Sequence, residues 1–322
     1  MNGTPALDAH LASLLDEDAR RALSGALGAR AHFDEPLAPH TSWKIGGPAD
    51  AFAAVESAAE LAAVLALAFK RRLPWFVLGS GSNLLVGDGG VRGIVLRLGG
   101  EFAAIAIDPA TGDGLPGDVV VRAGASASMA RLCTEAASAG ALGIDALAGI
   151  PGSVGGSLRM NAGTDRELGE FVRDVRVQTP ARPEPHSVTP QYYYRHSTLA
   201  RDAVVASVTL GFARGDVRAV RERMQQRLVR RKHSQPLQLP SAGSCFRNPP
   251  GASAGHLIEA VGAKGWREGD AEVSEVHANF IVNRGHATAA ETASLLARVR
   301  RAVADRFEIE MELEVHFVGV FA

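Results

Sequence analysis

One serine hydroxyl stands in a short turn of the sequence where its chemistry is restricted to proton donation. Ser244 follows a glycine within the segment 241–249, and Pro240 and Pro249 lie at the two sides of this turn. The chain has no Gly-x-Ser-x-Gly elbow and no histidine at a triad-like spacing, so a hydrolase nucleophile is not indicated. A serine held rigidly without a base can still donate a proton to a carbanion. That chemistry requires a hydride donor elsewhere in the protein.

Two loops rich in glycine and serine can seat such a donor through their backbone amides. In the first, Gly79-Ser80-Gly81-Ser82-Asn83-Leu84, the dinucleotide fingerprint fails because Leu84 takes the third glycine position and a second strand follows. Alone, this loop favours a β-turn between strands. The second loop, Pro151-Gly152-Ser153-Val154-Gly155-Gly156, changes this interpretation, because two such loops can hold a pyrophosphate from both sides. Asn161 adds a side-chain amide, and a flexible surface loop stays the alternative for 149–163.

The composition is that of an ordinary globular protein. The 322 residues include 46% apolar and 21% charged side chains, enough for two or three domains. A net charge of −1 argues against recruitment of nucleic acid or an anionic membrane. Because only Cys133 and Cys245 are present, we expect neither a disulfide framework nor a zinc site. The N-terminus lacks the apolar part of a secretory signal, and the longest apolar run, 61–69, is too short to cross a bilayer. We therefore expect a cytoplasmic protein.

The first two thirds of the chain read as strands with a few helices between them. Residues 1–30 look like a polar helical lead-in rather than part of a core. Ser57 opens a capping box, which predicts a helix to about Arg72, and the segment 149–163 has too little periodicity for a regular element. The remaining predictions are a helix over 128–138 and strands over 75–78, 84–86, 93–98, 119–122, 172–178 and 203–212.

A basic helix separates this region from a second one. The helix, over 216–232, lacks interleaved aromatic residues, so a solvated helix is favoured over a nucleic-acid-binding one. His277 and His286 have no partners at metal-ligand spacing, and we expect no metal. The later elements predicted are a short helix over 254–261, a strand over 278–282, a long helix whose capping box begins at Thr288, and a strand of alternating character over 309–317.

Five motifs occur in an order that is specific to one enzyme family. They are Gly79-Ser80-Gly81-Ser82-Asn83-Leu84-Leu85-Val86, Ile150 to Gly156 with Asn161-Ala162-Gly163, Tyr194-Arg195-His196-Ser197, Gly243-Ser244-Cys245-Phe246-Arg247-Asn248-Pro249, and Glu312-Leu313-Glu314-Val315-His316-Phe317-Val318-Gly319. From about Leu37 to Gly319 the chain resembles the UDP-N-acetylenolpyruvoylglucosamine reductases, flavoenzymes of peptidoglycan precursor synthesis. The segment 277–283, and the absence of an inserted loop bearing a tyrosine after Phe212, resemble the shorter second type of this family.

The resemblance implies an α+β fold in two main parts. A FAD-binding domain of the vanillyl-alcohol-oxidase (PCMH) type, in two subdomains, precedes a C-terminal α+β substrate-binding domain. We place the lead-in at 1–30, the FAD-binding domain at 31–213 and the substrate-binding domain at 214–322. The first glycine loop has no histidine of the kind that tethers FAD in many relatives of this fold, so we expect dissociable FAD. The residues implied to contact FAD are Gly79, Ser80, Gly81, Ser82, Asn83, Leu84, Pro151, Gly152, Ser153, Gly155, Gly156 and Asn161.

The family's reaction implies a role for three side chains. NADPH reduces FAD, a hydride reaches carbon-3 of the enolpyruvyl group of UDP-N-acetylglucosamine-enolpyruvate, and a proton reaches carbon-2. Ser244 matches the proton donor, Arg195 the active-site arginine and Glu314 the catalytic glutamate. A guanidinium offers a permanently charged fork to the substrate carboxylate, and a glutamate there helps most when burial keeps it protonated. Without the resemblance, simpler interpretations apply: Ser244 satisfies the backbone of a turn, Arg195 lies at the surface, and Glu314 belongs to a row of solvated acidic residues.

Four further residues match substrate contacts of the family, namely Tyr194, Lys232, Arg247 and Asn248. The chain departs from the family at two places, where Leu313-Glu314-Val315-His316 replaces the frequent Pro-Glu-Val-Arg and Arg247 replaces a frequent lysine. Both concern the surroundings of the three groups. We expect a monomer that acts on a small molecule.

Two other functions are compatible with parts of the sequence. An oxygen-using flavin oxidase of the same fold should carry a tethering histidine and aromatic oxidase residues, which are not evident. A non-catalytic protein that binds a UDP-sugar or flavin should have lost one of Ser244, Arg195 and Glu314, and all three are present.

Overall fold

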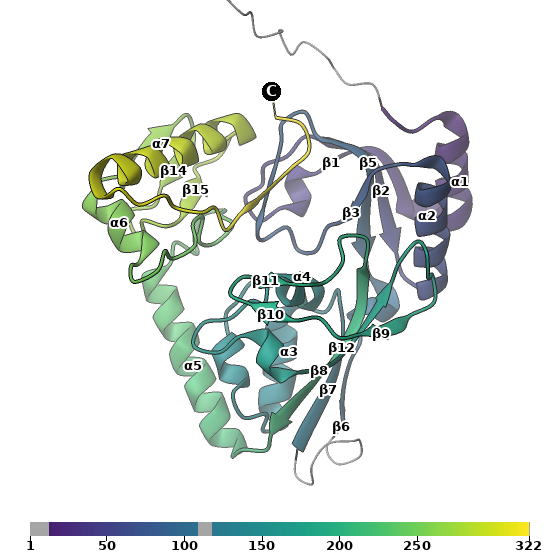
Figure 1. Cartoon of the computed structure of the whole chain (residues 1–322), viewed down its shortest axis with the longest axis horizontal. Coiled ribbons are helices and arrows are strands. Elements are labelled where there is room, and N and C mark those ends of the chain that lie inside the picture. The colour runs from purple at the N-terminus through teal and green to yellow at the C-terminus, as the bar shows by residue number, and fades with distance from the viewer. Residues whose placement is uncertain (1–12, 109–117, 322) are drawn as a thin grey trace, which may run out of the picture.

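Two lobes joined by one long helix make up the computed structural model, which describes residues 13–108 and 118–321 (Figure 1). The first lobe holds two sheets, and the second holds a small sheet with two helices. The joining helix, α5 (Val217–Ser234), begins at Asp216, whose carboxylate accepts from the amide of Ala219 at 2.8 Å.

The first sheet is mixed, with strand order β1-β2-β5-β3. Strands β1 (Ala31–Pro36) and β2 (Pro48–Val55) are antiparallel, while β5 (Val91–Leu98) runs parallel to β2 and to β3 (Trp75–Val77). Helices α1 (Glu17–Leu27) and α2 (Ala58–Arg71) lie together at the outer side of this sheet in Figure 1. Three 3₁₀ turns occur in this part, η1 (Gly28–Arg30), η2 (Ala38–His40) and η3 (Gly100–Ala103).

The second sheet is antiparallel, with strand order β6-β7-β12-β8-β9. Side chains from both sheets and from helices α3 and α4 share one hydrophobic core. A two-stranded hairpin of β10 (Tyr192–Tyr193) and β11 (His196–Ser197) lies beside α4. The other bounds are β6 (Ile105–Asp108), β7 (Asp118–Gly124), α3 (Met129–Ser138), η4 (Ile144–Leu147), α4 (Val154–Arg159), η5 (Leu168–Phe171), β8 (Val172–Gln178), β9 (His186–Val188) and β12 (Val204–Ala213).

The second lobe is built on an antiparallel sheet of β13 (Arg267–Glu268), β14 (Ala271–Val273) and β15 (Ile281–Asn283). Helices α6 (Ala254–Ala260) and α7 (Ala289–Phe307) cover it. Thr288 forms the predicted capping box at the start of α7, because its hydroxyl accepts from Glu291 N while the Glu291 carboxylate accepts from Thr288 N.

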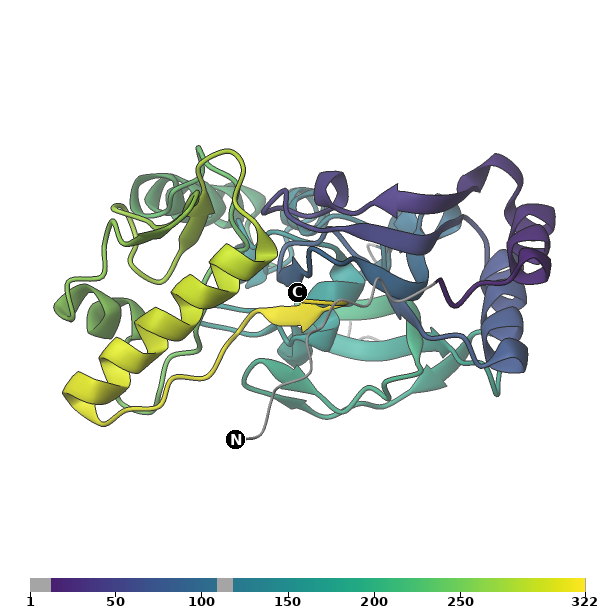
Figure 2. The same cartoon turned by 90° about the horizontal axis from the view of Figure 1, so that it is seen from above.

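Three sets of contacts fix the second lobe to the first. The indole Nε1 of the fully buried Trp43 donates to the carbonyl of Ile281 at 2.7 Å, and Asn283 donates to the carbonyl of Trp43 at 2.9 Å. The carboxylate of Asp88 accepts from the first two amides of α7 at 2.8 and 2.9 Å. The final strand, β16 (His316–Val318), leaves the second lobe and pairs in parallel with β4 (Leu84–Val86), as Figure 2 shows.

Two expectations for the first lobe were wrong. The described part of the N-terminal segment is no mere lead-in, because α1 places Ala19, Leu23 and Leu27 in the core with at most 3% exposure; residues 1–12 lie outside the described residues. The segment 149–163 contains a helix, α4, whose first amides are capped by Ser153 (Oγ to Gly156 N, 3.4 Å).

The end of the chain also differs from its prediction. Met311 and Val315 are buried and Glu308, Glu310 and Glu312 are exposed, as expected, but Phe317, expected on the buried side, is 41% exposed. Most of 309–315 has no neighbouring strand, however. Leu313 makes an isolated bridge to Phe246, and regular strand pairing begins only at β16. The strand expected over 278–282 begins later, as β15 at Ile281.

Truncating α1 at its buried face tests its place in the core. Leu23 is 0% exposed, so Leu23→Ala should lower the free energy of unfolding by about 2–5 kcal/mol, measured by urea denaturation. Leu14→Ala is the matched control, because that side chain is 50% exposed and its loss should cost no more than about 0.5 kcal/mol. Equal losses in the two variants would contradict the packing of α1.

Candidate active site

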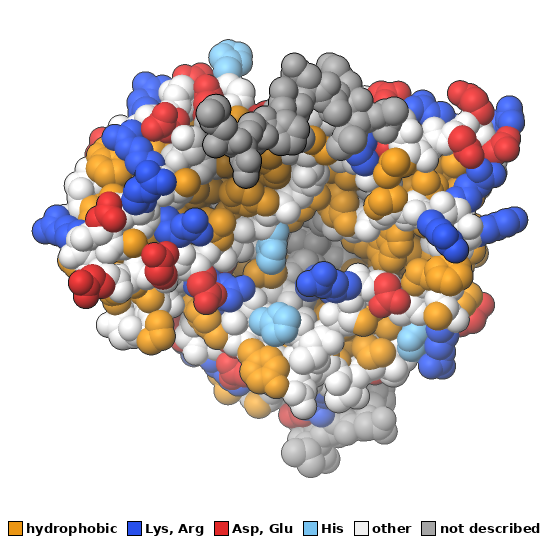
Figure 3. Space-filling model, turned by 45° about the horizontal axis from the view of Figure 1, so that its top comes forward, with side chains coloured by type: hydrophobic (Ala, Val, Ile, Leu, Met, Phe, Trp, Pro, Cys, Tyr) orange, Lys and Arg blue, Asp and Glu red, His pale blue; other side chains and the backbone are white. Residues whose placement is uncertain are grey.

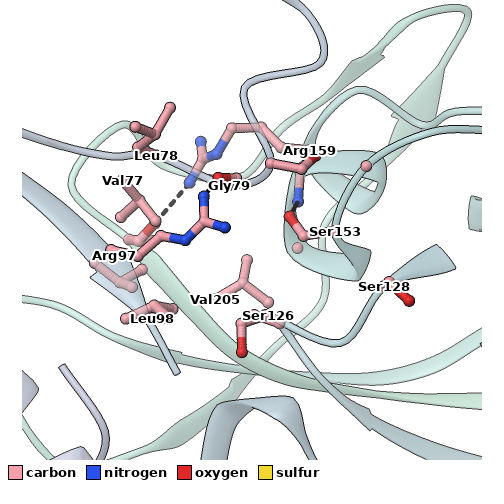
Figure 4. Close-up of a pocket in the computed structure, with 17 residues that line it drawn as sticks. Val77, Leu78, Gly79, Arg97, Leu98, Ser126, Ser128, Ser153, Arg159 and Val205 are labelled. Carbon is pink, nitrogen blue, oxygen red and sulfur yellow. Dashed lines mark hydrogen bonds between the residues drawn. The ribbon is translucent and has the colours of Figure 1, made fainter. Parts of the chain in front are cut away.

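The two predicted glycine loops meet at a cavity of about 220 Å³ in the first lobe (Figure 4). A β-carbon on Gly79 would come within 2.6 Å of Ser153 Oγ, and one on Gly152 would come within 3.1 Å of Ser82 Oγ. Gly79 and Ser80 line the cavity from one side, and the residues from Gly152 to Gly156, except Val154, line it from the other. The loops therefore face each other, and only glycine leaves the space between them open.

Two half-buried arginines that the sequence analysis missed reach the same cavity. Figure 4 shows the guanidinium groups of Arg97 and Arg159 converging near Gly79. Burial lowers the pKa of both side chains. Arg97 donates to the carbonyl of Gly79, and Arg159 donates to the carbonyl of Ala203 at 2.6 Å. Two desolvated cations that are held by neutral carbonyls form a strong site for an anion.

The remaining walls of the cavity suit a planar apolar group joined to that anion. Val77, Leu78, Leu98, Val204 and Val205 line it. The buried hydroxyl of Ser126, also in the lining, has no hydrogen-bond partner among the described residues. These residues fit the FAD implied by the resemblance, with the arginines and loop amides available to the pyrophosphate.

Other residues of the first loop connect the cavity to the end of the chain. Gly81 adopts a φ of +64°, and its carbonyl accepts from Ser42 N at 3.1 Å. Asn83 Nδ2 donates to the carbonyl of Glu314 at 3.0 Å, and the carbonyl of Asn83 accepts from His316 N at 3.0 Å. Leu84 begins β4, so this loop supports the segment that carries Glu314.

Two other residues of the second loop region that were predicted to contact FAD, Pro151 and Asn161, do not line the cavity. Pro151 is exposed at the start of the loop. Asn161 is 1% exposed, and protein groups occupy its amide: it donates to the carbonyl of Tyr193 (3.0 Å) and to Glu167, and accepts from Gly169 N (2.8 Å). The side chain thus braces the 163–169 turn against the hairpin, and its contact with FAD stays a prediction.

Arg195 and Glu314 form an ion pair at the edge of the first lobe. Arg195 Nε donates to Glu314 Oε1 at 2.9 Å, although the two residues are 119 positions apart. Arg195 has a φ of +54° in the turn of the β10–β11 hairpin, and its guanidinium lies 4.7 Å from the centre of the Tyr194 ring. The hairpin therefore presents the arginine directly to the last segment of the chain.

Ser244 lies in the segment that runs beside Glu314. The carbonyl of the next residue, Cys245, accepts from Glu314 N at 2.8 Å. The buried Asn279 holds this segment in place, because its carbonyl accepts from Cys245 N (2.9 Å) and its side chain bonds both backbone groups of Phe246 (2.9 and 2.8 Å). The structure thus brings the segments of all three predicted catalytic residues together, and it adds Asn279 as a support that was missed.

The environment of Glu314 favours its protonated form. Burial raises the pKa of this carboxyl group above its ordinary value, and Arg195 and then Arg247 oppose the shift without cancelling it. This direction agrees with the expectation of a protonated glutamate.

The four predicted substrate contacts lie around this pair and on the joining helix. Tyr194 is 47% exposed, and Lys232 is exposed near the end of α5. Arg247 bonds Glu312 at 3.0 Å and has a buried Nε without a hydrogen-bond partner among the described residues. Asn248 accepts from Ala254 N at 3.0 Å at the start of α6. On the face drawn in Figure 3, histidine and cationic side chains border a hollow between the lobes.

Comparison with known proteins places the fold in a class. A family model described as an FAD binding domain matches residues 49–181, so the chain is an FAD-binding protein. A second model, of the UDP-N-acetylenolpyruvoylglucosamine reductase C-terminal domain, matches residues 235–318.

Relatives and a solved structure give the family. The UDP-N-acetylenolpyruvoylglucosamine reductase of Moorella thermoacetica is 46% identical over 89% of this chain and 92% of its own length. A second such reductase, from Symbiobacterium thermophilum, is 45% identical over 88% of this chain and 91% of its own. The crystal structure of the Thermus caldophilus enzyme matches with a TM-score of 0.75 and 36% identity, over 89% of this chain and 98% of that one. The chain belongs to the UDP-N-acetylenolpyruvoylglucosamine reductase family.

These matches confirm several predictions made from the sequence. The family, the α+β fold class with an FAD-binding part and a family-specific C-terminal part, and FAD as cofactor are confirmed. The domain boundaries and the roles of single residues stay predictions. In the described part of the chain, no helix combines the length and apolarity needed to cross a membrane.

Removing one half-buried cation tests the FAD site. Arg97→Leu should weaken FAD binding roughly 10- to 100-fold, because charge-assisted hydrogen bonds contribute about 1.5–3 kcal/mol. The affinity is measured by titrating the apoprotein with FAD and following flavin fluorescence. Arg122→Leu, on the exposed side of β7, removes the same charge outside the cavity and should leave the affinity unchanged. An unaltered affinity in Arg97→Leu would exclude this arginine from the site.

Proposed function

We propose that the protein catalyses the NADPH-dependent reduction of the enolpyruvyl double bond of UDP-N-acetylglucosamine-enolpyruvate, which gives UDP-N-acetylmuramate for peptidoglycan synthesis. The observation that supports this most is the contact of Arg195 with Glu314 beside the Ser244 segment. FAD, once bound and reduced by NADPH, would supply the hydride for carbon-3.

The chain's own groups manage charge and protons at the substrate. Arg195 neutralises the substrate carboxylate, where negative charge grows as the hydride adds. Ser244 delivers a proton to carbon-2; a hydroxyl is a weak acid in water, but the carbanion formed at that carbon is a strong base. Glu314 acts in its protonated form, as a neutral donor beside the same carboxylate.

Rigid support makes a serine adequate as a proton donor. The segment of Ser244 is fixed by Asn279 on one side and by the amide of Glu314 on the other. Its backbone therefore has little freedom, and the proton is presented at a constant place.

A spectrum and one assay test the proposed function. The purified protein should be yellow, and its oxidation of NADPH should depend on added UDP-N-acetylglucosamine-enolpyruvate. A colourless protein that does not take up FAD, or NADPH oxidation that ignores the enolpyruvyl sugar, would overturn it. We further propose a monomer in the cytoplasm, to be tested by sedimentation and cell fractionation.

Replacing the serine should separate the two halves of the reaction. Ser244→Ala should lower kcat about 10²- to 10⁴-fold, because positioned proton transfer contributes that much. The reduction of bound FAD by NADPH does not use this proton and should keep its rate, measured by anaerobic stopped flow as the bleaching of the visible flavin absorbance. A kcat near that of the wild type would assign the proton to another group.

The pH dependence should report on Glu314. A raised pKa means that the carboxyl group keeps its proton below that pKa and loses it as the pH rises through it. If the protonated form is active, kcat/KM of the wild type should fall on the alkaline side. Glu314→Gln cannot titrate, so its profile should lack this alkaline limb at a lower overall rate. A limb that persists unchanged in Glu314→Gln would belong to a different group.

A further inference from the structure

Arg195 lies between two carboxylates rather than beside one. Its Nε bonds Glu314, while its Nη1 lies 3.8 Å from Oε1 of Glu167, which the sequence analysis did not single out. Its Nη2 donates to the carbonyl of Gly163 at 3.1 Å. Because 3.8 Å exceeds hydrogen-bonding distance, Glu167 attracts the guanidinium but leaves the Nη1 hydrogens available to an incoming anion.

The turn that carries Glu167 is fixed by several contacts besides the bond from Arg195 to Gly163. Gly163 and Glu167 are joined by an antiparallel bridge, and Thr164 Oγ1 donates to the carbonyl of Ala146 at 2.7 Å. Asp165 accepts from Arg227 of α5 at 2.6 Å. The turn is therefore a rigid support, and Arg195 is the group that adapts to it.

Arg195 needs a second carboxylate nearby when Glu314 is protonated and therefore neutral. Glu314 in its protonated form no longer balances the permanent charge of Arg195, whose side chain is only 18% exposed. Among the described residues, Arg247, a cation, also acts on Glu314, and Glu314 in turn acts on the buried thiol of Cys245. Glu167 is thus the carboxylate that continues to balance Arg195.

We propose that Glu167 is a positioning residue, which holds the guanidinium of Arg195 in place while Glu314 carries its proton and so leaves Nη1 directed to the carboxylate of the substrate. This rests on the proposed function. Without Glu167, Arg195 would turn wholly to Glu314 and stabilise its charged form. Glu314 would then lose its proton at a lower pH.

Two charge-removing variants of one turn test this proposal. Glu167→Gln keeps the size of the side chain and an acceptor for Asn161. It should lower kcat about tenfold, leave KM for the enolpyruvyl sugar unchanged or lower, and move the alkaline limb of kcat/KM to lower pH. Glu170, in the same 3₁₀ turn, pairs with Arg166 and accepts from the amide of Glu167 at 2.7 Å; Glu170→Gln keeps an acceptor for that amide, so it should behave as the wild type.

Further measurements separate a positioning role from a structural one. FAD content and the thermal unfolding midpoint should match in the two variants, and Glu167→Asp, which keeps the charge, should return the alkaline limb to its wild-type place. An unmoved limb in Glu167→Gln, or a displaced one in Glu167→Asp, overturns the proposal. Failure of the proposed function is a different result, since the wild type itself would then show no turnover of the enolpyruvyl sugar.

Discussion

The site depends on the return of the last segment of the chain from the second lobe to the first glycine loop. Strand β16 pairs with β4, and Asn83 donates to the carbonyl of Glu314 at 3.0 Å. On the other side, Glu314 N donates to the carbonyl of Cys245 at 2.8 Å. The backbone of Glu314 is therefore held by hydrogen bonds from two directions. The position of Glu314 beside Arg195 does not depend on the charge of the Glu314 side chain. A group whose position is independent of its charge can change protonation without leaving the site.

The chain contains a second arginine–glutamate pair that shows what burial does at Glu314. At the surface, Arg30 donates two hydrogen bonds to Glu60 at 2.8 and 2.6 Å, and these, followed by the amide of Glu56, lower the pKa of Glu60 to about 2. Glu314 has one bond from Arg195 at 2.9 Å, and burial outweighs it, so its pKa rises. The same residue types thus shift the pKa of a glutamate in opposite directions, and the difference lies in desolvation and in the number of donors.

Local signals in the sequence predicted the elements whose stability is local. The capping box of Thr288 is complete within a few residues, and α7 forms there. Helix α4 was missed because its stability comes from a distant neighbour: Gly155 faces Ala125 so closely that a β-carbon would lie 2.8 Å away. Arg97 did leave a signal, since it and Arg92 are charged residues in a mostly apolar strand and each requires a partner, but the partner of Arg97 is a carbonyl that only the fold supplies. The Arg195–Glu314 contact spans 119 positions, so nothing local could reveal it, and only the order of the family's motifs indicated it.

The two departures from the family's pattern belong to one electrostatic environment. His316 follows Glu314 by two residues, and its ring lies against Met160 (Nε2 to Sδ, 3.1 Å). Desolvation of this ring lowers the pKa of His316, and the charge of Arg247 lowers it further. The lowered pKa favours the neutral form of this histidine, whereas an arginine would place a second permanent positive charge near Arg247. Because a positive charge favours the ionised carboxylate, a neutral histidine in place of the family's arginine favours ionisation of Glu314 less, whereas Arg247 keeps the charge of the lysine that it replaces and lowers the pKa of Glu314.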